Sequence, residues 1–313
     1  MTQLENLVFC GTPQFAVPTL EKLVEAGFNV RLVLTQPDRP KGRGLGLVAS
    51  PLKQTALRLG LPVYQPEKIK QNEELRARLD EIAPVAIVVV GYGRIIPSWM
   101  LQLPKHGNIN LHASLLPKYR GAAPIQWAIA NGESVTGVST MRINEGLDTG
   151  DILQQKELAI LDEDTAETLS PRLAAIGAEL MVETLRGLSA GTISAQPQKA
   201  EDATLAPILK KEDGRIDFSR TAPEIFNRLR GFQPWPGAFT SFRGKPLNIT
   251  AARLSEEEVS QAQLLVRDDK LFVGCGSSTS LELLEVQPAG KKRISALDFV
   301  HGYRPEVGER LGE

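Results

Sequence analysis

Short runs of apolar residues alternate with amphipathic segments along the first half of the chain. The run 85–90, Val-Ala-Ile-Val-Val-Val, has no polar position, which is typical of a central strand buried on both faces of a parallel sheet. Shorter apolar runs predict further strands at 7–11, 30–34, 61–64 and 109–111. Apolar positions at helical spacing predict helices over 18–26, between Ser50 and Gly60, and over 71–82. This alternation predicts an α/β fold with an open, doubly wound, mostly parallel sheet, which binds ligands beyond the carboxyl ends of its strands.

The pattern changes in the second half of the chain. A long helix is predicted over 165–187, beginning near Asp164, and residues 189–207 have the small, polar and Pro-containing composition of a linker. Five short runs separated by turn residues then predict a small β-barrel or sandwich: 238–242, 246–250, 263–267, 270–274 and 281–286. We therefore expect two domains, 1–188 and 208–313, joined by the linker 189–207.

The composition fits this organisation and excludes several classes of protein. The 313 residues suggest two domains, and 36 basic against 37 acidic residues give a net charge of −1, which argues against a tail-driven nucleic-acid binder but allows a local basic patch. Two cysteines and three histidines leave no disulfide framework or four-cysteine zinc site and little room for a metal cluster. No apolar run approaches the ~18 residues of a membrane span, and the N-terminus lacks the basic segment of a signal peptide. We expect a soluble, cytoplasmic protein.

The densest polar cluster follows the predicted strand 109–111. Side chains alternate along a strand, so Asn110 and His112 point to the same side at its carboxyl end. An amide and an imidazole there can donate to a developing oxyanion or move protons beside it. The alternative is a strand-end Asn in a turn beside a hydrogen-bonded core His, which any α/β fold can offer. These two residues by themselves leave both interpretations open.

A second cluster, Gly146-Leu147-Asp148-Thr149-Gly150, places an aspartate in a tight loop after an apparent strand. A carboxylate in that position can orient an imidazole and stabilise its charge. An ordinary Asp in a glycine-rich turn is the alternative, and such turns are common.

Basic residues gather in two places. Residues 38–46, Asp-Arg-Pro-Lys-Gly-Arg-Gly-Leu-Gly, form a basic, glycine-rich loop. Its glycines are not a dinucleotide-binding motif, because they do not lie between the first strand and a helix, and that strand ends instead in Gly11-Thr12-Pro13. The triplet Lys291-Lys292-Arg293 fits contact with phosphate. A solvated surface turn is the alternative for both segments.

Two motifs carry a resemblance to a known family. They are Asn110-x-His112-x-Ser114-Leu115-Leu116-Pro117-x-Tyr119-Arg120-Gly121 and Asp148-Thr149-Gly150, and with them the chain resembles the folate-dependent formyltransferase family. Further segments resemble the bacterial members of this family whose amine substrate is methionyl initiator tRNA. These segments are 11–13, 35–40 with 42–44, 121–126, 234–236 and 284–292, so the resemblance runs from the first strand almost to the C-terminus.

The resemblance implies transfer of a formyl group from 10-formyltetrahydrofolate to the α-amino group of methionyl initiator tRNA, giving N-formylmethionyl-tRNA for translation initiation. It also implies a second domain that is an OB-like β-barrel, no metal, no membrane association and no obligate protein partner. The residues that it implicates fall into three groups: Asn110, His112 and Asp148 as catalytic; Ser114, Leu115, Leu116 and Pro117 as folate-binding; and Arg39, Lys41 and Arg43 as tRNA-binding. Main-chain groups of residues 92–96 are expected at the pterin edge.

Two other functions are weighed against this one. The first is a formyltransferase with the same catalytic core that acts on a sugar or another small amine, and the second domain and the basic loop argue against it. The second is a non-catalytic RNA-binding protein on a decayed enzyme fold, and the intact Asn110, His112 and Asp148 argue against that.

Overall fold

The computed structural model describes residues 6–41 and 46–313. These residues form two compact units, each assembled from separate stretches of the chain. The first unit contains the described residues up to Gly121 with Thr136–Ala159 and Ser170–Ala206, and the second contains Ala122–Val135, Ile160–Leu169 and Pro207–Glu313. Two stretches that precede residue 170 thus belong to the second unit. The domain limits at 188 and 208 stay a prediction.

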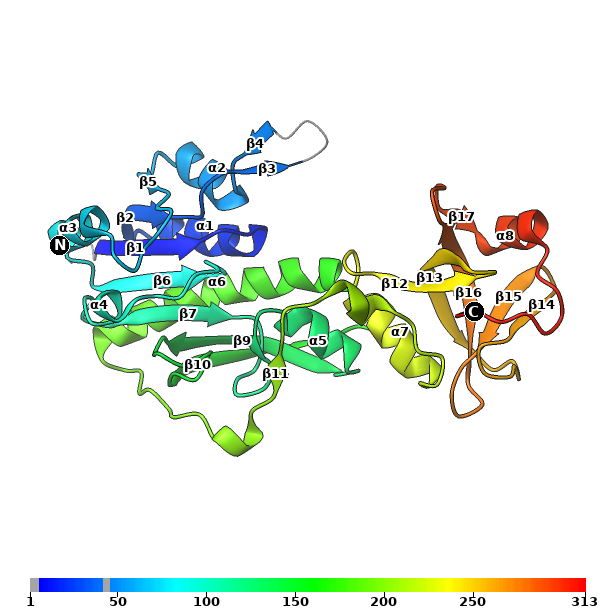
Figure 1. Cartoon of the computed structure of the whole chain (residues 1–313). Helices are drawn as coiled ribbons and strands as arrows, with labels where there is room; N and C mark the ends of the chain where they lie inside the picture. The colour runs from blue at the N-terminus through cyan, green and yellow to red at the C-terminus, as the bar shows by residue number, and fades with distance from the viewer. Residues whose placement is uncertain (1–5, 42–45) are drawn as a thin grey trace. The chain divides into compact units, whose positions relative to one another are not determined.

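A seven-stranded sheet forms the centre of the first unit. Its strands are β1 Asn6–Gly11, β2 Asn29–Leu34, β5 Val63–Tyr64, β6 Ala86–Val90, β7 Asn108–His112, β9 Val135–Arg142 and β10 Ile152–Ala159. They lie in the order β10-β9-β7-β6-β1-β2-β5 (Figure 1). Strands β1, β2, β5, β6 and β7 are parallel, and β9 pairs with β7 in the antiparallel sense. The predicted open, mostly parallel sheet is confirmed, and the wholly apolar run forms its fully buried strand β6.

Helices cover both faces of this sheet. They are η1 Gln14–Ala16, α1 Val17–Glu25, α2 Pro51–Arg58, α3 Glu73–Ile82, α4 Ser98–Leu101 and α6 Ala166–Ala190. The short η2 Ala200–Asp202 has no buried residue and is not part of these layers. Two short ribbons lie outside the sheet: β3 Arg39–Lys41 with β4 Gly46–Val48, and β8 Arg120–Gly121 with β11 Leu205–Ala206. On β1, Val8 and Cys10 share a core cluster with Leu75 of α3, whereas Gly11, of the opposite parity, lies against Leu52 of α2. The alternation of side chains along one strand therefore needs a helical layer on each side.

The predicted helix starts have a local cause. Ser50 accepts the Lys53 N–H through its hydroxyl at 3.1 Å, directly before Pro51 at the start of α2. Thr165 does the same for the Thr168 N–H at 3.3 Å, so α6 begins at Ala166. Each hydroxyl satisfies a backbone donor that has no partner inside its helix.

Helix α6 runs along the sheet (Figure 1) and is held there by contacts with β7 and β9. Its Gly177 leaves room for Leu111, since a Cβ atom at that glycine would lie 2.7 Å from a Leu111 methyl carbon. The Thr184 hydroxyl lies 2.8 Å from that of Thr140 on β9. The helix thereby supports the strand that ends in His112 from its buried side.

An antiparallel sheet dominates the second unit. The elements of this unit are α5 Pro124–Ala130, η3 Lys211–Gly214, α7 Ala222–Gly231, β12 Ala238–Phe242, β13 Lys245–Ser255, β14 Leu264–Arg267, β15 Lys270–Gly274, β16 Ser280–Pro288, β17 Ile294–Ser295 and α8 Ala296–Tyr303. The strand order is β12-β13-β16-β15-β14, with β17 added to β16 (Figure 1). All five short runs of the sequence are strands here, so the predicted smaller β-domain is confirmed.

The C-terminal residues bridge the two edge strands of this sheet. Leu311 pairs with Phe242 at the end of β12, and Arg310 pairs with Gln263 directly before β14. Edge strands otherwise present unpaired backbone groups, and this bridging covers them as a barrel does. The C-terminal residues thus link the two edges of this sheet, and this link is in keeping with the barrel that the resemblance implied.

Within the part of the chain that the structure describes, no helix is both long enough and apolar enough to cross a membrane.

Candidate active site

The candidate site lies at the carboxyl ends of the parallel strands of the first unit. There β1 lies between β6 and β2, which is the point where the strand order of a doubly wound sheet reverses. Thr12 after β1 and Gln36 after β2 both donate to the main-chain oxygen of Tyr92 after β6, at 3.3 and 2.9 Å. Three strand ends are therefore held together by polar side chains at the place where such sheets bind ligands.

His112 is the last residue of β7, and only 6% of its surface is exposed. Its Nε2 lies 2.9 Å from the main-chain oxygen of Tyr119, and because a carbonyl only accepts, this assigns the Nε2 proton. Its Nδ1 faces Asp148, with 3.7 Å to Oδ2, and both side chains are largely buried. The structure thus brings together two residues that the sequence separates by 36 positions.

The loop that carries Asp148 holds it in an unusual backbone conformation. Its φ of 51° lies in the left-handed region, which is costly for a residue with a side chain. The carboxylate Oδ2 accepts the Gly121 N–H at 2.9 Å. Asn144 closes the loop from inside, since its Oδ1 accepts from the Gly146 N–H at 3.0 Å and from the Thr149 hydroxyl at 2.8 Å. The carboxylate therefore has a fixed position beside the imidazole.

Asn110 lies two residues before His112 on β7 and is half-buried. The alternation of side chains places both on one side of the sheet. Its side-chain amide has no hydrogen-bond partner within residues 6–41 and 46–313. A half-buried amide of this kind has donors to offer to a bound molecule.

The predicted folate turn is well ordered, but its serine faces inward. Ser114 is fully buried, and its hydroxyl donates to a main-chain oxygen of the same turn at 2.6 Å. The Ser139 hydroxyl donates to the Ser114 carbonyl at 2.6 Å and accepts the Leu116 N–H at 3.0 Å. Leu116 is buried as well, whereas Leu115 and Pro117 are partly exposed. Side-chain contact with a ligand in this turn thus falls to Leu115 and Pro117.

The segment 92–96 combines a buried anchor with an exposed tip. Tyr92 is 1% exposed, and burial raises the pKa of its hydroxyl above the usual value, whereas Ile95 is 91% exposed. Gly93 has a φ of 71°, and a Cβ there would lie 2.6 Å from Gln36 Nε2. Only glycine allows both that backbone conformation and the approach of Gln36.

Of the predicted tRNA-binding residues, Arg39 is exposed on β3. Lys41 ends the same strand, but its side chain, like the whole of Arg43, lies outside the described residues. The base of the ribbon is anchored by Asp38, which accepts from Lys53 Nζ at 2.5 Å and from Gln65 Nε2 at 2.8 Å. Among residues 6–41 and 46–313, no hydrogen bond or ion pair joins Arg39 to His112 or Asp148.

We expect the free energy of unfolding of Asp38→Asn to fall less steeply than that of the wild type as the pH is lowered from about 5 to 3. Hydrogen bonds from Lys53 and then Gln65 hold the Asp38 pKa below its ordinary value of 3.8. A carboxyl whose pKa is lowered by folding stabilises the protein above its unfolded pKa, and this contribution is lost as pH falls through the folded value. Urea unfolding between about pH 5 and pH 3 measures it. Lys53→Met should reduce this pH dependence in the same way. If the free energy of unfolding of both variants falls with pH as steeply as that of the wild type, the prediction is wrong.

The basic triplet at 291–293 is partly engaged by its own unit. Lys291 Nζ lies 5.5 Å from the centroid of the Tyr303 ring, and Arg293 lies 3.8 Å from a Glu285 carboxylate oxygen. These contacts favour the surface-turn alternative for this segment.

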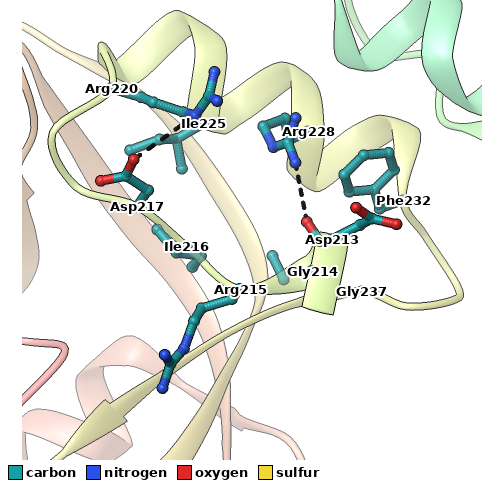
Figure 2. A pocket seen from close by; sticks show the side chains of 11 residues that line it. Asp213, Gly214, Arg215, Ile216, Asp217, Arg220, Ile225, Arg228, Phe232 and Gly237 are labelled. Atoms are coloured by element: carbon teal, nitrogen blue, oxygen red, sulfur yellow. Dashed lines mark hydrogen bonds and ion pairs between the residues drawn. The ribbon is translucent and has the colours of Figure 1, made fainter. Parts of the chain in front are cut away.

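A small hollow of the second unit is lined by charged side chains that are engaged by neighbouring groups (Figure 2). Arg228 donates to the Asp213 carbonyl at 3.1 Å and lies over the Phe232 ring at 4.8 Å, and Arg220 lies 4.0 Å from Asp217. Its volume of about 10 Å³ suits a single water molecule. This hollow is a packing feature and contains none of the predicted site residues.

The two cysteines are unsuited to nucleophilic chemistry. Cys10 and Cys275 are both buried, and burial raises the pKa of both thiols, that of Cys275 to about 12. Their thiolates are therefore scarce at neutral pH. Among the described residues, no group of three or more His, Cys, Asp or Glu side chains is arranged to hold a metal ion.

Both parts of the chain match known families. Residues 5–185 match the formyl transferase family, and residues 208–304 match the formyl transferase C-terminal domain. The chain therefore belongs to the formyl transferase family. Within it, the chain is 65% identical over 306 residues to the methionyl-tRNA formyltransferase of Koribacter versatilis, covering 98% of each chain. It is 60% identical over 309 residues to the methionyl-tRNA formyltransferase of Acidobacterium capsulatum, covering 98% of this chain and 99% of that one.

Solved structures share the fold at low sequence identity. WlaRD, a sugar 3N-formyl transferase in the presence of dTDP and 5-N-formyl-THF, aligns with a TM-score of 0.66 and 19% identity over 93% of this chain and 100% of that chain. HypX from Aquifex aeolicus in complex with tetrahydrofolic acid aligns with a TM-score of 0.60 and 16% identity over 98% of this chain and 49% of that chain.

Sequence reasoning missed the residues that support the site. Gln198 contacts the Asp148 loop, and Ser139 holds the turn after β7. Neither has a local signal: Gln198 lies in a segment with the composition of a linker, and Ser139 is one small polar residue within a strand. Only their long-range contacts reveal them.

Proposed function

We propose that the protein transfers the formyl group of 10-formyltetrahydrofolate to the α-amino group of methionyl initiator tRNA, with Asn110, His112 and Asp148 as its catalytic residues. The observation that carries the proposal is the buried His112 imidazole, oriented by Tyr119 and facing Asp148, beside the half-buried amide of Asn110. The 65% identity to a methionyl-tRNA formyltransferase over nearly the whole chain supports the choice of substrate. We assign the reaction to the cytoplasm, where translation is initiated.

The reaction begins with the neutral amine. Free α-amino groups titrate near ~7.7–8.0, so a usable neutral fraction exists at neutral pH. The amine nitrogen attacks the formyl carbon, a C–N bond forms, and the carbonyl electron pair moves to oxygen. The C=O bond then re-forms as the bond from the formyl carbon to N10 breaks, and the proton lost by the amine ends on N10.

The protein supplies charge stabilisation and a proton route. The Asn110 amide donates to the developing oxyanion. At His112, the Nε2 proton is held by the Tyr119 carbonyl, and the 3.7 Å between Nδ1 and Asp148 Oδ2 exceeds a hydrogen bond. Nδ1 is therefore available to accept the proton lost by the amine, directly or through a bound water, and to pass it on toward N10. Asp148 orients the imidazole and stabilises its charged form.

The donor is assigned to the loops around these strand ends. Leu115 and Pro117 offer partly exposed apolar surface directly after β7. We assign Ser114 and Leu116, which are buried, to shaping the turn, with only main-chain groups toward the folate. The main chain of 92–96 offers polar groups for the pterin edge.

A single assay tests the proposed reaction. Labelled 10-formyltetrahydrofolate is offered with charged initiator tRNA, with uncharged initiator tRNA, and with a panel of nucleotide-linked amino sugars. Formyl transfer to the charged tRNA alone is expected. Transfer to an amino sugar but not to the tRNA would show the small-amine alternative to be correct.

Neutralising Arg39, Lys41 and Arg43 together to alanine is expected to weaken tRNA binding and to flatten its salt dependence. Each lost phosphate contact should remove about 0.7–0.9 from the slope of log affinity against log salt. Affinity for the folate donor should stay that of the wild type, because Leu115 and Pro117 are unchanged. Equilibrium binding of tRNA at several salt concentrations measures the slope.

Lys22→Ala is the control for this triple variant. Lys22 is a surface cation of α1 that already pairs with Glu25 at 3.1 Å. Its loss should leave the salt slope unchanged. If the triple variant and the wild type have the same salt slope, these three residues do not contact the phosphates of tRNA, and the segment is an ordinary solvated surface turn.

A further inference from the structure

Gln198 connects the Asp148 loop to the chain segment that holds the Asp148 carboxylate. Its Nε2 donates to the Asp148 carbonyl at 2.9 Å and to the Gly150 carbonyl at 2.6 Å. Its Oε1 accepts from Arg120 Nε at 3.0 Å and from Nη2 of the same guanidinium at 2.7 Å. Both ends of one half-buried amide are thus fully used.

These contacts close a ring around the carboxylate. Arg120 precedes Gly121, whose N–H donates to Asp148 Oδ2 at 2.9 Å. The chain therefore runs from the Asp148 carboxylate to Gly121, to Arg120, to Gln198 and back to the Asp148 main chain. Because the φ of Asp148 is 51°, this residue needs outside support to keep its conformation.

The same segment supports His112 from the other side. The main-chain carbonyl of Thr204 accepts the main-chain N–H of Arg120 at 2.9 Å. The hydroxyl of Thr204 accepts the main-chain N–H of Tyr119, also at 2.9 Å. Tyr119 is the residue whose carbonyl fixes Nε2 of His112. Residues that the sequence analysis assigned to a linker therefore hold both members of the pair.

We propose that Gln198 is a positioning residue for formyl transfer, acting on the carboxylate of Asp148 through the main chain of its loop; this rests on the proposed function. Glutamine supplies two donors and an acceptor on one side chain. Glutamate keeps only the acceptor, and methionine keeps the length without either. A displacement of about 1 Å in a reacting constellation can cost about 10²-fold in rate, so the support of this loop bears directly on turnover.

Gln198→Met tests the proposal in the full-length protein. We expect kcat for formyl transfer to fall by about 10- to 100-fold, while KM for the charged tRNA stays within about twofold of the wild type. The Gly121 amide proton should exchange faster with solvent, because its acceptor is no longer held in place. Gln198→Glu keeps the contact with Arg120, and we expect it to fold as the wild type does and to lose kcat as the Met variant does.

Gln196→Ala is the matched control. Gln196 lies two residues away in the same segment, its side chain is exposed and makes no hydrogen bond among the described residues, and its main chain pairs with Ile152. Its kcat and its Gly121 exchange rate should equal those of the wild type. A loss in this variant as large as in Gln198→Met would assign the effect to the segment as a whole and overturn the proposal.

The coupling to Asp148 separates positioning from general stability. In an Asp148→Asn background, Gln198→Met should lower the residual kcat by less than about twofold, because the group that it positions has already lost its charge. A full additive loss in that background, or wild-type kcat in folded Gln198→Glu, overturns the proposal. If the wild-type protein does not transfer a formyl group, the proposed function is wrong. In that case the exchange of the Gly121 amide proton still tests the positioning role, and an unchanged exchange rate in Gln198→Met would refute it.

Discussion

Replacing His112 with alanine is expected to lower kcat for formyl transfer by about 10²–10⁴-fold, the usual contribution of a positioned acid–base group. The side chain is buried at the end of β7 and is oriented from both ring nitrogens, by the Tyr119 carbonyl and by Asp148. Its loss removes the imidazole that we propose as the proton route and that Asp148 faces. Single-turnover formylation of charged initiator tRNA at saturating donor measures the effect.

His301→Ala is the control for this variant. His301 lies on α8 in the second unit and is exposed, so its loss should leave kcat unchanged. If His112 and Asp148 act as one unit, the double variant should lose much less than the product of the single losses. Near wild-type turnover in His112→Ala would remove His112 from the mechanism.

Replacing Gly150 with alanine is expected to damage both stability and turnover. A Cβ atom at this buried position would lie 1.7 Å from the Arg142 carbonyl oxygen, a backbone atom that has no flexible side chain to move aside. The loop from Asn144 to Gly150 must therefore shift, and it carries Asp148. We expect a loss of about 1–3 kcal/mol in the free energy of unfolding and a fall in kcat of about 10²-fold or more. Urea unfolding and single-turnover assays measure the two effects.

Gly302→Ala is the opposite case. Gly302 lies in α8, and a Cβ there meets no atom within 4 Å. The free energy of unfolding of this variant should rise by about 0.5–1 kcal/mol because alanine favours the helix, without any change in kcat.

Wild-type stability and turnover in Gly150→Ala would contradict the first prediction. They would show that the loop adapts easily and that the position of Asp148 is not restricted by Gly150.

Local patterns were sufficient to predict most elements. The wholly apolar run became the fully buried β6, and the Ser50-Pro51 pair became the start of α2 with the expected hydroxyl cap. Helix α6 lies within three residues of its predicted limits, 165–187 against Ala166–Ala190. Such features depend on neighbouring residues and on a short repeat, so they are readable from a single sequence.

The pairing of the site residues was accessible only through the family motifs. Alternation along β7 placed Asn110 and His112 on one side, but no spacing rule connects His112 with Asp148. The inward orientation of the Ser114 hydroxyl was not predicted, because its acceptor is the Lys118 carbonyl of its own turn, and this turn is held by Ser139 of β9, whose hydroxyl donates to the Ser114 carbonyl. Local sequence does not specify the conformation of a turn that a residue of another strand holds in place.

The sequence by itself determined the class of the sheet, the positions of its strands and helices, and the chemistry present at the strand ends, because periodicity and capping act over a few residues. The tertiary structure alone decided which distant residues meet. It placed Asp148 beside His112, brought Gln198 onto the Asp148 loop and Thr204 onto Tyr119, and returned Leu311 to β12 to cover an edge of the second sheet. These contacts join residues far apart in the chain, and they form only when the whole core packs, so no local pattern records them.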